Sequence, residues 1–381
     1  MDVRRDFAGL KQQYKNVALG LGNFDGVHRG HQKLIRRLVT ESHEKGDVSG
    51  ILTFDPHPLA VLRPDQCPPF LLSQQAKFEV LERLGVELVV ALPFNYEFAR
   101  LTPYDFVKEI LCREMQVRSV VVGYNFAFGH RGQGTPDTLA EYAHLCGYSV
   151  SVIPPVMMGD VVVSSTLIRS LLLEGRVEEA ARFLGYSPFV DGMVIQGDRR
   201  GSTIGIPTAN LTMRSELVIP ARGVYAVKVE AHGECYGGVA NIGLRPTFKE
   251  NNTESNIEVH ILDFARDLYG QEIRVHLISR LRDECKFASV HDLLAQINLD
   301  IEAARRCFAE SPRVHTSPPY FSIIPLWCKC LVSVMYYSGT SAVSPISSAK
   351  HRRAASMSRL ICASKSCTEA NLHSSRSRLI R

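Results

Sequence analysis

Long hydrophobic runs are missing from this sequence of 381 residues. No apolar stretch reaches the roughly 20 residues that a transmembrane helix needs. The N-terminus also lacks the apolar core of a secretory segment, because charged residues occupy positions 2, 4, 5 and 6. We therefore expect a cytoplasmic protein that does not bind a membrane.

Closely spaced cysteines are missing from most of the chain, although it contains ten cysteines. Those at positions 67, 112, 146, 235, 285 and 307 stand alone, without a Cys-x-x-Cys pair or a histidine spacing suited to zinc. This pattern argues against a zinc site and predicts reduced, mostly buried thiols.

Net charge is small, at +5, and it is unevenly distributed. Residues 311–381 contain ten Lys and Arg and a single Glu. This segment therefore carries a net charge of +9, and the preceding residues carry −4. A mildly acidic body does not favour a nucleic-acid surface, and we expect no specific nucleic-acid partner. The Ser-rich, basic residues 311–381 are expected to be disordered, as a natural tail or a frame-shifted terminus.

Two domains are predicted, because the chain is longer than one hydrophobic core usually organises. In residues 1–186, apolar runs alternate with amphipathic stretches, which predicts an α/β domain with a parallel sheet covered by helices. The expected strands are residues 17–21, 50–54, 87–92, 118–123 and 148–153, and the expected helices are 31–45, 73–84, 103–115, 135–146, 165–174 and 176–185.

In residues 187–310 the pattern changes to closely spaced strands at 189–196, 223–231, 234–242, 257–262 and 272–279. Short connections with turn residues predict a mostly β domain, an antiparallel barrel or a sandwich, and of the two we expect the barrel. Apolar residues recur at helical spacing from Val290 to Phe308. They predict a terminal amphipathic helix packed on the barrel.

A glycine-rich turn with two histidines follows the first expected strand. Residues 22–31 read Gly-Asn-Phe-Asp-Gly-Val-His-Arg-Gly-His, and a helix is expected directly afterwards. Backbone N–H groups at a helix start bind phosphates, and His28 and His31 can donate hydrogen bonds to charge that develops at a phosphorus. Capping or packing is the alternative role, but the pairing of the histidines around Gly30 favours the chemical one.

This segment resembles the HxGH signature of nucleotidyltransferases, and its longer form is similar to the bacterial bifunctional riboflavin kinase/FAD synthetase family. The resemblance implies a Rossmann-like FMN adenylyltransferase domain joined to a riboflavin kinase domain. It also implies that ATP is bound in the first domain by residues of this segment, namely Gly22, Phe24, Asp25, Gly26, His28, Gly30 and His31.

Two further segments of the first domain match the same family. Residues 53–58, Thr-Phe-Asp-Pro-His-Pro, imply a flavin or nucleotide contact at His57, and the loop at 123–129 implies one at Asn125. Each can also be a turn residue alone, since His57 is flanked by prolines and Asn125 lies in a glycine-bounded turn.

Residues 163–169, Val-Ser-Ser-Thr-Leu-Ile-Arg, resemble the Ser-Ser-Thr-x-Ile-Arg segment of the family. The resemblance implies that the ATP phosphates are bound by Ser164, Ser165, Thr166 and Arg169. Ser165 and Thr166 are also good helix N-caps, whereas the guanidinium of Arg169 suits phosphate in a way that capping does not require. Leu167 stands where the family often has another Arg, which predicts weaker phosphate binding.

In the second domain, residues 197–210 end in Pro-Thr-Ala-Asn and resemble the riboflavin kinase segment. The resemblance implies ATP binding by Gly201, Gly205, Pro207, Thr208 and Asn210. It also implies that Thr208 and Asn210 hold Mg²⁺ through the hard oxygen ligands that this ion prefers. Ser202 replaces a more usual Arg, which removes one possible phosphate contact.

Glu258 lies between apolar neighbours in an expected strand, where a carboxylate usually faces solvent. The resemblance implies instead that Glu258 is the general base that accepts the proton of the ribityl 5′-hydroxyl. It also implies a flavin or nucleotide contact at Arg245, in a segment that is a mobile substrate loop in the family, and a position near the flavin for Arg282. An exposed ion pair is an alternative role for Arg282.

We therefore expect an enzyme that phosphorylates riboflavin to FMN and adenylylates FMN to FAD, with ATP as co-substrate and Mg²⁺ as cofactor. Two alternatives are a riboflavin kinase with a weak adenylyltransferase half, because of Leu167, and a flavin-sensing or nucleic-acid-binding protein with a basic effector tail. The histidine pair and Glu258 favour the bifunctional enzyme, because sensing needs no general base. The sequence does not predict an oligomeric state.

Overall fold

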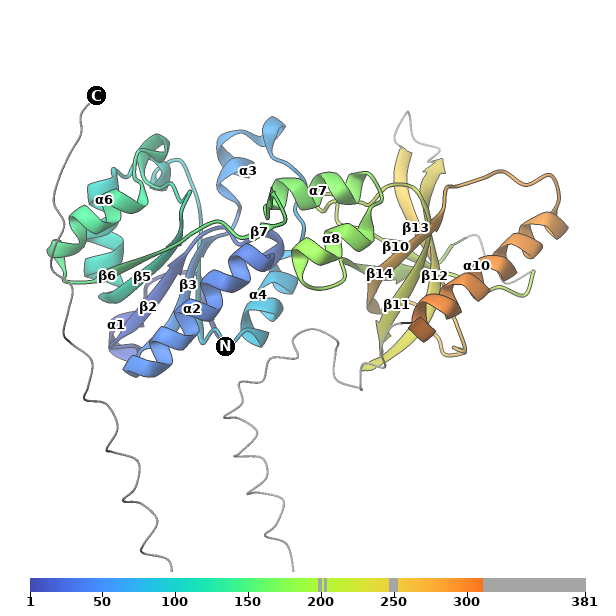
Figure 1. Ribbon diagram of the computed structural model, residues 1–381, viewed down its shortest axis with the longest axis horizontal. Helices are drawn as coiled ribbons and strands as arrows, with labels where there is room; N and C mark the ends of the chain where they lie inside the picture. The colour runs from blue at the N-terminus through green and yellow to red at the C-terminus, as the bar shows by residue number, and fades with distance from the viewer. Residues whose placement is uncertain (198–200, 202–203, 247–252, 311–381) are drawn as a thin grey trace, which may run out of the picture. The chain divides into compact units, whose positions relative to one another are not determined.

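A computed structural model describes residues 1–197, 201, 204–246 and 253–310 of the protein (Figure 1). The expected tail at 311–381 and Ser202 lie outside the described residues, and so does the side chain of Arg245.

A six-stranded parallel sheet forms the centre of the first domain, in the order β1-β4-β3-β2-β5-β6. All five expected strands are confirmed, and the short β1 is an addition. The strands are β1 (Asp2–Arg4), β2 (Val17–Leu21), β3 (Val48–Phe54), β4 (Leu88–Leu92), β5 (Val117–Gly123) and β6 (Ser149–Ile153).

Helices cover both faces of this sheet, as Figure 1 shows. Every residue of β2 is buried, with Leu19 and Leu21 in the core on one face and Ala18 in the core on the other. The longer helical segments are α2 (Arg29–Lys45), α4 (Gln74–Arg83), α5 (Pro103–Asp105) with its π-helical continuation η4 (Phe106–Glu114), α6 (Pro136–Glu141) with η6 (Tyr142–Leu145), α7 (Ser165–Leu173) and α8 (Val177–Leu184).

Short elements complete the domain between these helices and strands. They are α1 (Leu10–Gln13), η1 (Asp25–Val27), α3 (Pro58–Leu62), η2 (Pro64–Gln66), η3 (Phe98–Arg100), η5 (His130–Gly132) and the two-stranded pair β7 (Met157–Met158) and β8 (Val161–Val162).

The order of the strands reverses at β2. The chain places β3 and β4 on one side of β2 and then β5 and β6 on the other side. In open parallel sheets such a reversal leaves a crevice beyond the carboxyl ends of the two diverging strands, and ligands bind there. The turn at 22–28 follows β2 and the loop at 124–129 follows β5, so both lie at this position.

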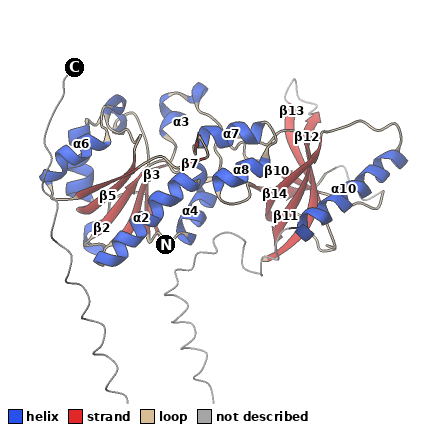
Figure 2. Ribbon diagram, viewed as in Figure 1, coloured by secondary structure: helices blue, strands red, loops and turns tan. Residues whose placement is uncertain are grey.

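The second domain is a closed antiparallel barrel in the order β10-β13-β12-β11-β14-β9 (Figure 2). The barrel is therefore confirmed over the sandwich. Its strands are β9 (Phe189–Ile195), β10 (Ala209–Thr212), β11 (Gly223–Ala231), β12 (Glu234–Pro246), β13 (Thr253–Ile261) and β14 (Glu272–Arg282). The expected strands are present, and β10 is an addition of only four residues.

The expected terminal helix is α10 (Val290–Glu310). Its fully buried Ala304, with Ile301 and Phe308, packs against apolar residues of β11 and β12. Helices α7 and α8 contribute to a separate core with the interior of the barrel, in which Ile168 and Leu171 share one cluster with Val227.

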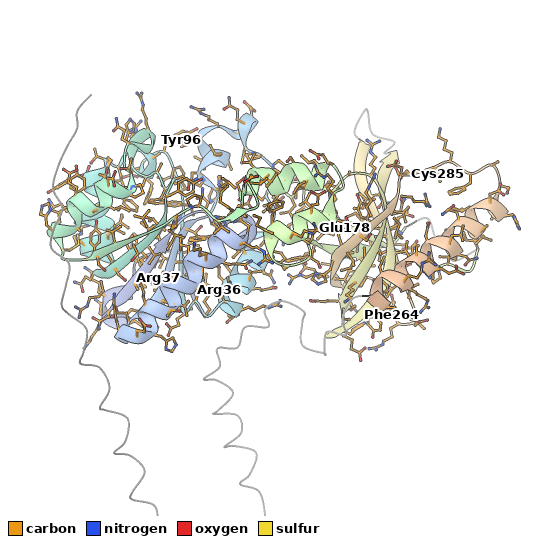
Figure 3. All side chains as sticks on the ribbon, viewed as in Figure 1. Arg36, Arg37, Tyr96, Glu178, Phe264 and Cys285 are labelled. Carbon is orange, nitrogen blue, oxygen red and sulfur yellow. A yellow bond between two sulfur atoms is a disulfide. The ribbon has the colours of Figure 1, made fainter. Side chains whose placement is uncertain are left out.

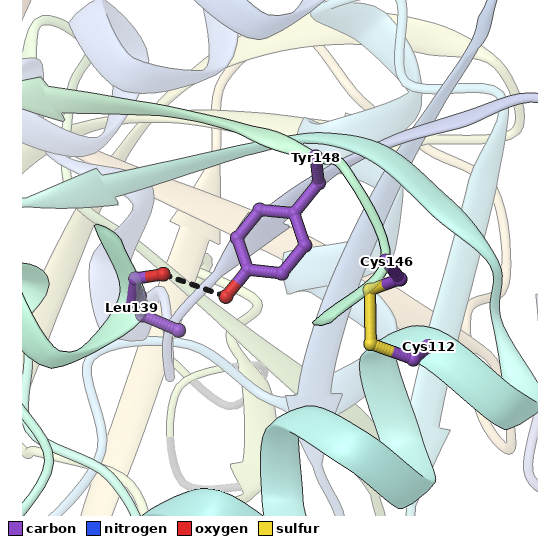
Figure 4. The surroundings of a disulfide bond; sticks show 4 residues. All are labelled: Cys112, Leu139, Cys146 and Tyr148. Carbon is purple, nitrogen blue, oxygen red and sulfur yellow. Dashed lines mark hydrogen bonds between the residues drawn. A yellow bond between two sulfur atoms is a disulfide. The ribbon is translucent and has the colours of Figure 1, made fainter. Parts of the chain in front are cut away.

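The cysteines differ from the prediction of reduced, mostly buried thiols. Cys112 in η4 and Cys146 after η6 form a disulfide (Figure 4). Cys235 is exposed, and so is Cys285 in the loop between β14 and α10 (Figure 3). The prediction failed because single cysteines 34 residues apart carry no sequence sign that the fold brings their Cα atoms within 5.6 Å.

A helix that crosses a membrane has to be both long and apolar. Within residues 1–197, 201, 204–246 and 253–310, none is both long enough and apolar enough to cross a membrane.

Candidate active sites

Two glycines of the segment after β2 stand where a side chain would collide with a neighbour. Gly26 has φ +75°, and a Cβ there would lie 2.5 Å from Cδ1 of Leu71. A Cβ on Gly30 would lie 3.0 Å from Cε1 of His28. Gly30 therefore leaves the space in which the His28 ring packs, which explains the His-x-Gly-His spacing.

The two histidines stack on each other at the start of α2, with ring centroids 3.7 Å apart. Nδ1 of His28 accepts a hydrogen bond from the backbone N–H of His31 at 3.4 Å, so His28 is the N-cap of the helix. Burial lowers the pKa of His28 to about 4 and lowers the pKa of His31 well below its ordinary range. Both rings are neutral at pH 7. Among the described residues, Nδ1 of His31 is buried and has no hydrogen-bond partner, as expected for a group that awaits a ligand.

Asp25 connects this turn to α7. Its carboxylate accepts hydrogen bonds from the backbone N–H of Leu71 and from Nη2 of Arg169, both at 2.9 Å. Burial raises the pKa of Asp25, while the Leu71 N–H and Arg169 oppose this effect. Asp25 and Arg169 thus form a largely buried ion pair that fixes the turn.

Arg169, expected at phosphate, is held by protein groups in this structure. Nε donates to the Pro69 carbonyl at 2.7 Å, and Nη2 donates to Asp25. The N-cap of α7 is Ser164, which accepts from the Leu167 N–H at 3.2 Å, so the expectation of a cap at Ser165 or Thr166 was one or two residues late.

The hydroxyls of the same segment divide between protein and solvent. Ser165 donates to the Asp25 carbonyl at 2.9 Å, whereas Thr166 is exposed. Leu167 packs on the apolar core that α7 and α8 share with the barrel, which accounts for an apolar residue at this position.

His57 and Asn125 lie beyond the ends of the strands that flank β2. His57 caps α3, because its Nδ1 accepts from the Leu59 N–H at 3.1 Å, and burial lowers its pKa to about 4. Asn125 is exposed in the loop after β5, with its Oδ1 near Gly123. Both positions are compatible with a ligand above β2, while the cap shows that His57 also has a structural role.

Sequence reasoning missed Lys77 of α4. It is 8% exposed, and its Nζ donates to the carbonyl of Asn23 in the turn at 3.2 Å. The available signal was helical spacing: Lys77 stands three and four residues before Val80 and Leu81, which are buried on the same helix.

The second site lies on adjacent strands of the barrel. Asn210 of β10 is paired in register with Glu258 of β13, and Asn241 of β12 pairs with Glu258 from the other side. Ile257 and Val259 are buried in the core, so Glu258 points to the opposite face of β13.

Asn256, also missed in the sequence, bridges the two expected residues. Its Nδ2 donates to Oε1 of Glu258 at 2.8 Å and to Oδ1 of Asn210 at 3.4 Å. The signal was the alternation along β13, since Asn256, Glu258 and His260 occupy every second position. Glu258, Asn256 and Asn210 therefore form one polar cluster.

The Pro-Thr-Ala-Asn segment is fixed next to this cluster. Nδ1 of His260 lies 2.8 Å from the Pro207 carbonyl. The Gly201 carbonyl accepts from the Ile206 N–H at 2.8 Å, and a Cβ on Gly201 would lie 3.3 Å from Oγ1 of Thr208. The chain folds back closely at Gly201, while Gly205 supplies a φ of +79°.

Arg282, expected at the flavin, forms an ion pair with Asp300 of α10. Nη2 lies 2.8 Å from Oδ2 of Asp300, whose side chain is 6% exposed. Nη1 donates to the Asp283 carbonyl at 2.9 Å. The ion pair is partly buried, not exposed as the alternative expected, and it connects β14 with α10.

The donor set of the second site fits a magnesium ion. Thr208 and Asn210 provide oxygen donors, and Glu258 adds a carboxylate close by. A Cβ on Gly197 would lie 2.2 Å from Nδ2 of Asn210, so this glycine leaves the room that the amide occupies. In the described part of the chain, no three His, Cys, Asp or Glu form a metal cluster of their own.

Two family models match successive parts of the chain. The model for FAD synthetase matches residues 10–167, and the model for riboflavin kinase matches residues 184–308.

Curated relatives match both parts together. A bifunctional riboflavin kinase/FMN adenylyltransferase from Bacillus subtilis (strain 168) is 39% identical over 303 residues, which cover 79% of this chain and 95% of the relative. One from Escherichia coli (strain K12) is 38% identical over 310 residues, with coverages of 81% and 98%.

A solved structure is similar over the same extent. The crystal structure described as a macrolide-efflux protein from Streptococcus pneumoniae has a TM-score of 0.72 and 33% identity, and the match covers 80% of this chain and 99% of that one.

Proposed function

Since this chain belongs to the bifunctional riboflavin kinase/FMN adenylyltransferase family, we propose that it converts riboflavin to FAD in two steps at two separate sites. The proposal concerns which residues act in each step. The observation that carries it is a pair of polar clusters, with His28 stacked on His31 after the carboxyl end of β2 and Glu258 joined through Asn256 to Asn210 on β13 and β10.

The kinase step takes place at the Glu258 cluster. Glu258 accepts the proton of the riboflavin 5′-hydroxyl. The hydroxyl oxygen attacks the γ-phosphorus of ATP, and ADP leaves. Asn256 donates to the carboxylate of Glu258 at 2.8 Å and so fixes its orientation. Little covalent chemistry remains for the protein, and positioning supplies most of the rate.

Thr208 and Asn210 would hold Mg²⁺ in this step. When bound, the ion neutralises charge on the transferred and leaving phosphates. Gly201 brings the backbone close to Thr208, which supports a phosphate-binding loop at this point.

The adenylyl step takes place at the turn after β2. A phosphate oxygen of FMN attacks the α-phosphorus of ATP, and pyrophosphate leaves with the electron pair of the broken bond. The neutral imidazoles of His28 and His31 donate hydrogen bonds to the charge that develops, and the N-terminus of α2 adds its positive dipole. ATP as co-substrate of both steps supports a cytoplasmic location.

Turnover of the purified chain tests this proposal. Riboflavin, ATP and Mg²⁺ are supplied, and FMN and FAD are separated by chromatography over time, in parallel with reactions that contain EDTA or Mn²⁺. We expect FMN to appear first and FAD to follow, with no product in EDTA. FMN without FAD would leave only the kinase, and no turnover of either flavin would contradict the assignment of both sites.

A further inference from the structure

A buried lysine beneath the first site has no role in the steps above. Lys77 lies on α4, outside every segment that resembles the family signatures. Lysine is rarely buried without a partner, because removing an ammonium from water is costly. Its position 8% exposed beside the turn at 22–28 therefore needs an explanation.

The contacts of Lys77 lead to the turn. Its Nζ donates to the Asn23 carbonyl at 3.2 Å, and Oγ1 of Thr53 donates to the same oxygen at 3.5 Å. Among the described residues, no carboxylate lies within ion-pair distance of this ammonium. One donor of Nζ is thus used by the turn, and two remain.

The other cation of the site is already paired. Arg169 donates to Asp25 at 2.9 Å and to the Pro69 carbonyl at 2.7 Å. The two stacked imidazoles are neutral at pH 7. Lys77 therefore carries the positive charge of this site that no carboxylate neutralises directly.

From this geometry we propose that Lys77 is a positioning residue of the adenylyl-transfer site. It holds the Asn23 carbonyl and so orients the turn that receives the nucleotide phosphates, and its ammonium stabilises their negative charge from beneath the turn. The inference rests on the proposed adenylyl step and adds a residue to it.

The charge of Lys77 should make the rate of adenylyl transfer depend on pH. Burial lowers the pKa of Lys77 to about 8, while Asp25 and Asp55 oppose this effect. The other groups that face it are His31, His57 and, beyond Asp25, Arg169. Below pH 8 the ammonium is charged and the site is competent. Above pH 8 the charge is lost, so kcat/KM for ATP should fall. Bound phosphates favour the charged form, so kcat should fall only at higher pH.

Three variants separate a charge role from a structural one. Lys77→Met keeps the length of the side chain without charge, Lys77→Arg keeps the charge without titrating, and Lys33→Met is a control at an exposed position of α2. FAD formation from supplied FMN is measured from pH 6 to 10, with the kinase step and the thermal midpoint as internal controls.

We expect Lys77→Met to lower kcat/KM for ATP by a factor on the order of 100, while the kinase step is unchanged. Lys77→Arg should recover a large part of this loss below pH 8 and should lose the alkaline fall. Full activity of Lys77→Met, or an alkaline fall that is the same in Lys77→Arg and the wild type, would overturn the proposal. If Lys77→Met does not fold, the comparison of Lys77→Arg with the wild type decides.

If the proposed adenylyl step is wrong, a separate binding measurement still tests the role of Lys77. A wild type that makes no FAD at any pH contradicts the proposed function. Binding of a non-hydrolysable ATP analogue, measured by calorimetry in an Asn210→Ala background that removes an oxygen ligand from the kinase site, then tests Lys77. Affinity that weakens above pH 8 in the wild type background but not with Lys77→Arg supports the role of the ammonium. Affinity that does not change with pH in either background overturns it.

Discussion

At the scale of single residues, the two sites depend on groups whose neighbours are now defined. Glu258 shares a hydrogen bond with Asn256 and has no contact with the first site among the described residues. His28 stacks on His31, and His31 also contacts Phe24, all within one turn and the start of one helix. Substitutions at one site should therefore leave the other active.

Glu258→Gln should abolish FMN formation and leave adenylylation of supplied FMN nearly intact. Loss of one general base typically costs a factor on the order of 10²–10⁴ in rate. Both reactions are followed by chromatography, and Glu272→Gln at an exposed position of β14 is the matched control. An equal loss of both activities in a folded Glu258→Gln protein would contradict the assignment of two sites.

His28→Ala or His31→Ala should block FAD formation and let FMN accumulate. The expected reason is the loss of hydrogen bonds to developing charge, which typically costs a factor on the order of 10²–10³ per donor. His43→Ala, at the exposed far end of α2, controls for the loss of a histidine from the same helix. If both variants still make FAD at the wild-type rate, the first site has been assigned wrongly.

At the scale of elements, the start of α2 should make the protein sensitive to acid. The pKa of His28 is about 4 in the folded protein, below its ordinary value of 6.5. Between these values only the unfolded chain binds the proton, so the free energy of unfolding falls as the pH drops from 6.5 to 4. One such group contributes about 1.4 kcal/mol per pH unit in this window.

The variant His28→Asn should reduce this acid sensitivity. Asparagine is a good N-cap and does not titrate, so the helix start is kept while one proton-binding group is removed. Thermal midpoints of the wild type and the variant are compared between pH 4 and pH 8. An identical dependence on pH in both proteins would show that His28 does not titrate as described.

The disulfide connects η4 to the segment after η6 on either side of β5. Closing a loop with a sequence separation of 34 residues stabilises a fold by about 3 to 4 kcal/mol in the chain-entropy model. Cys112→Ser should therefore lower the thermal midpoint by several degrees without changing either activity. Cys235→Ser, the control, should leave the thermal midpoint unchanged.

Mass spectrometry of unreduced peptides tests the same bond directly. A linked pair that contains Cys112 and Cys146 is the expected species in protein purified without reductant. Free thiols at both positions, with a Cys112→Ser midpoint equal to that of the wild type, would contradict the disulfide.

The elements also mark how far sequence reasoning reaches. Buried strands such as β2 and the amphipathic α2 were predicted because periodicity is a local signal. The four-residue β10 was missed because its pairing with β9 and β13 is decided by partners far along the chain. Alternation along β13 and the periodicity of α4 indicate the faces on which Asn256 and Lys77 lie. Their contacts with Asn210 and Asn23 became visible only in the structure, because the partners come from other segments.

At the scale of the whole molecule, length and the change of pattern near residue 187 predict two domains, and the parallel sheet and the barrel lie on either side of this position. The core that α7 and α8 share with the barrel was not foreseeable. The sequence pattern of an amphipathic helix predicts its apolar face, but it does not predict the surface on which that face packs.

The last prediction concerns truncation after residue 310. Helix α10 already covers the barrel, because Ala304 is fully buried and Phe308 packs so closely that a Cβ on Gly237 would lie 2.6 Å from its ring. The match to the riboflavin kinase family ends at residue 308. Truncation should therefore leave both activities and the thermal midpoint essentially unchanged, as chromatography and thermal unfolding of the two proteins can measure.

The sequence beyond residue 310 also predicts what the truncation removes. Its net charge of +9 should cause salt-sensitive, non-specific binding to polyanions, and the truncated chain should elute from heparin at lower salt. Truncation after residue 340 is the matched control, since it keeps the hydrophobic cluster at 321–337. If the shorter chain loses kinase activity or stability and the longer one does not, that cluster docks on the body and the second domain extends beyond residue 310.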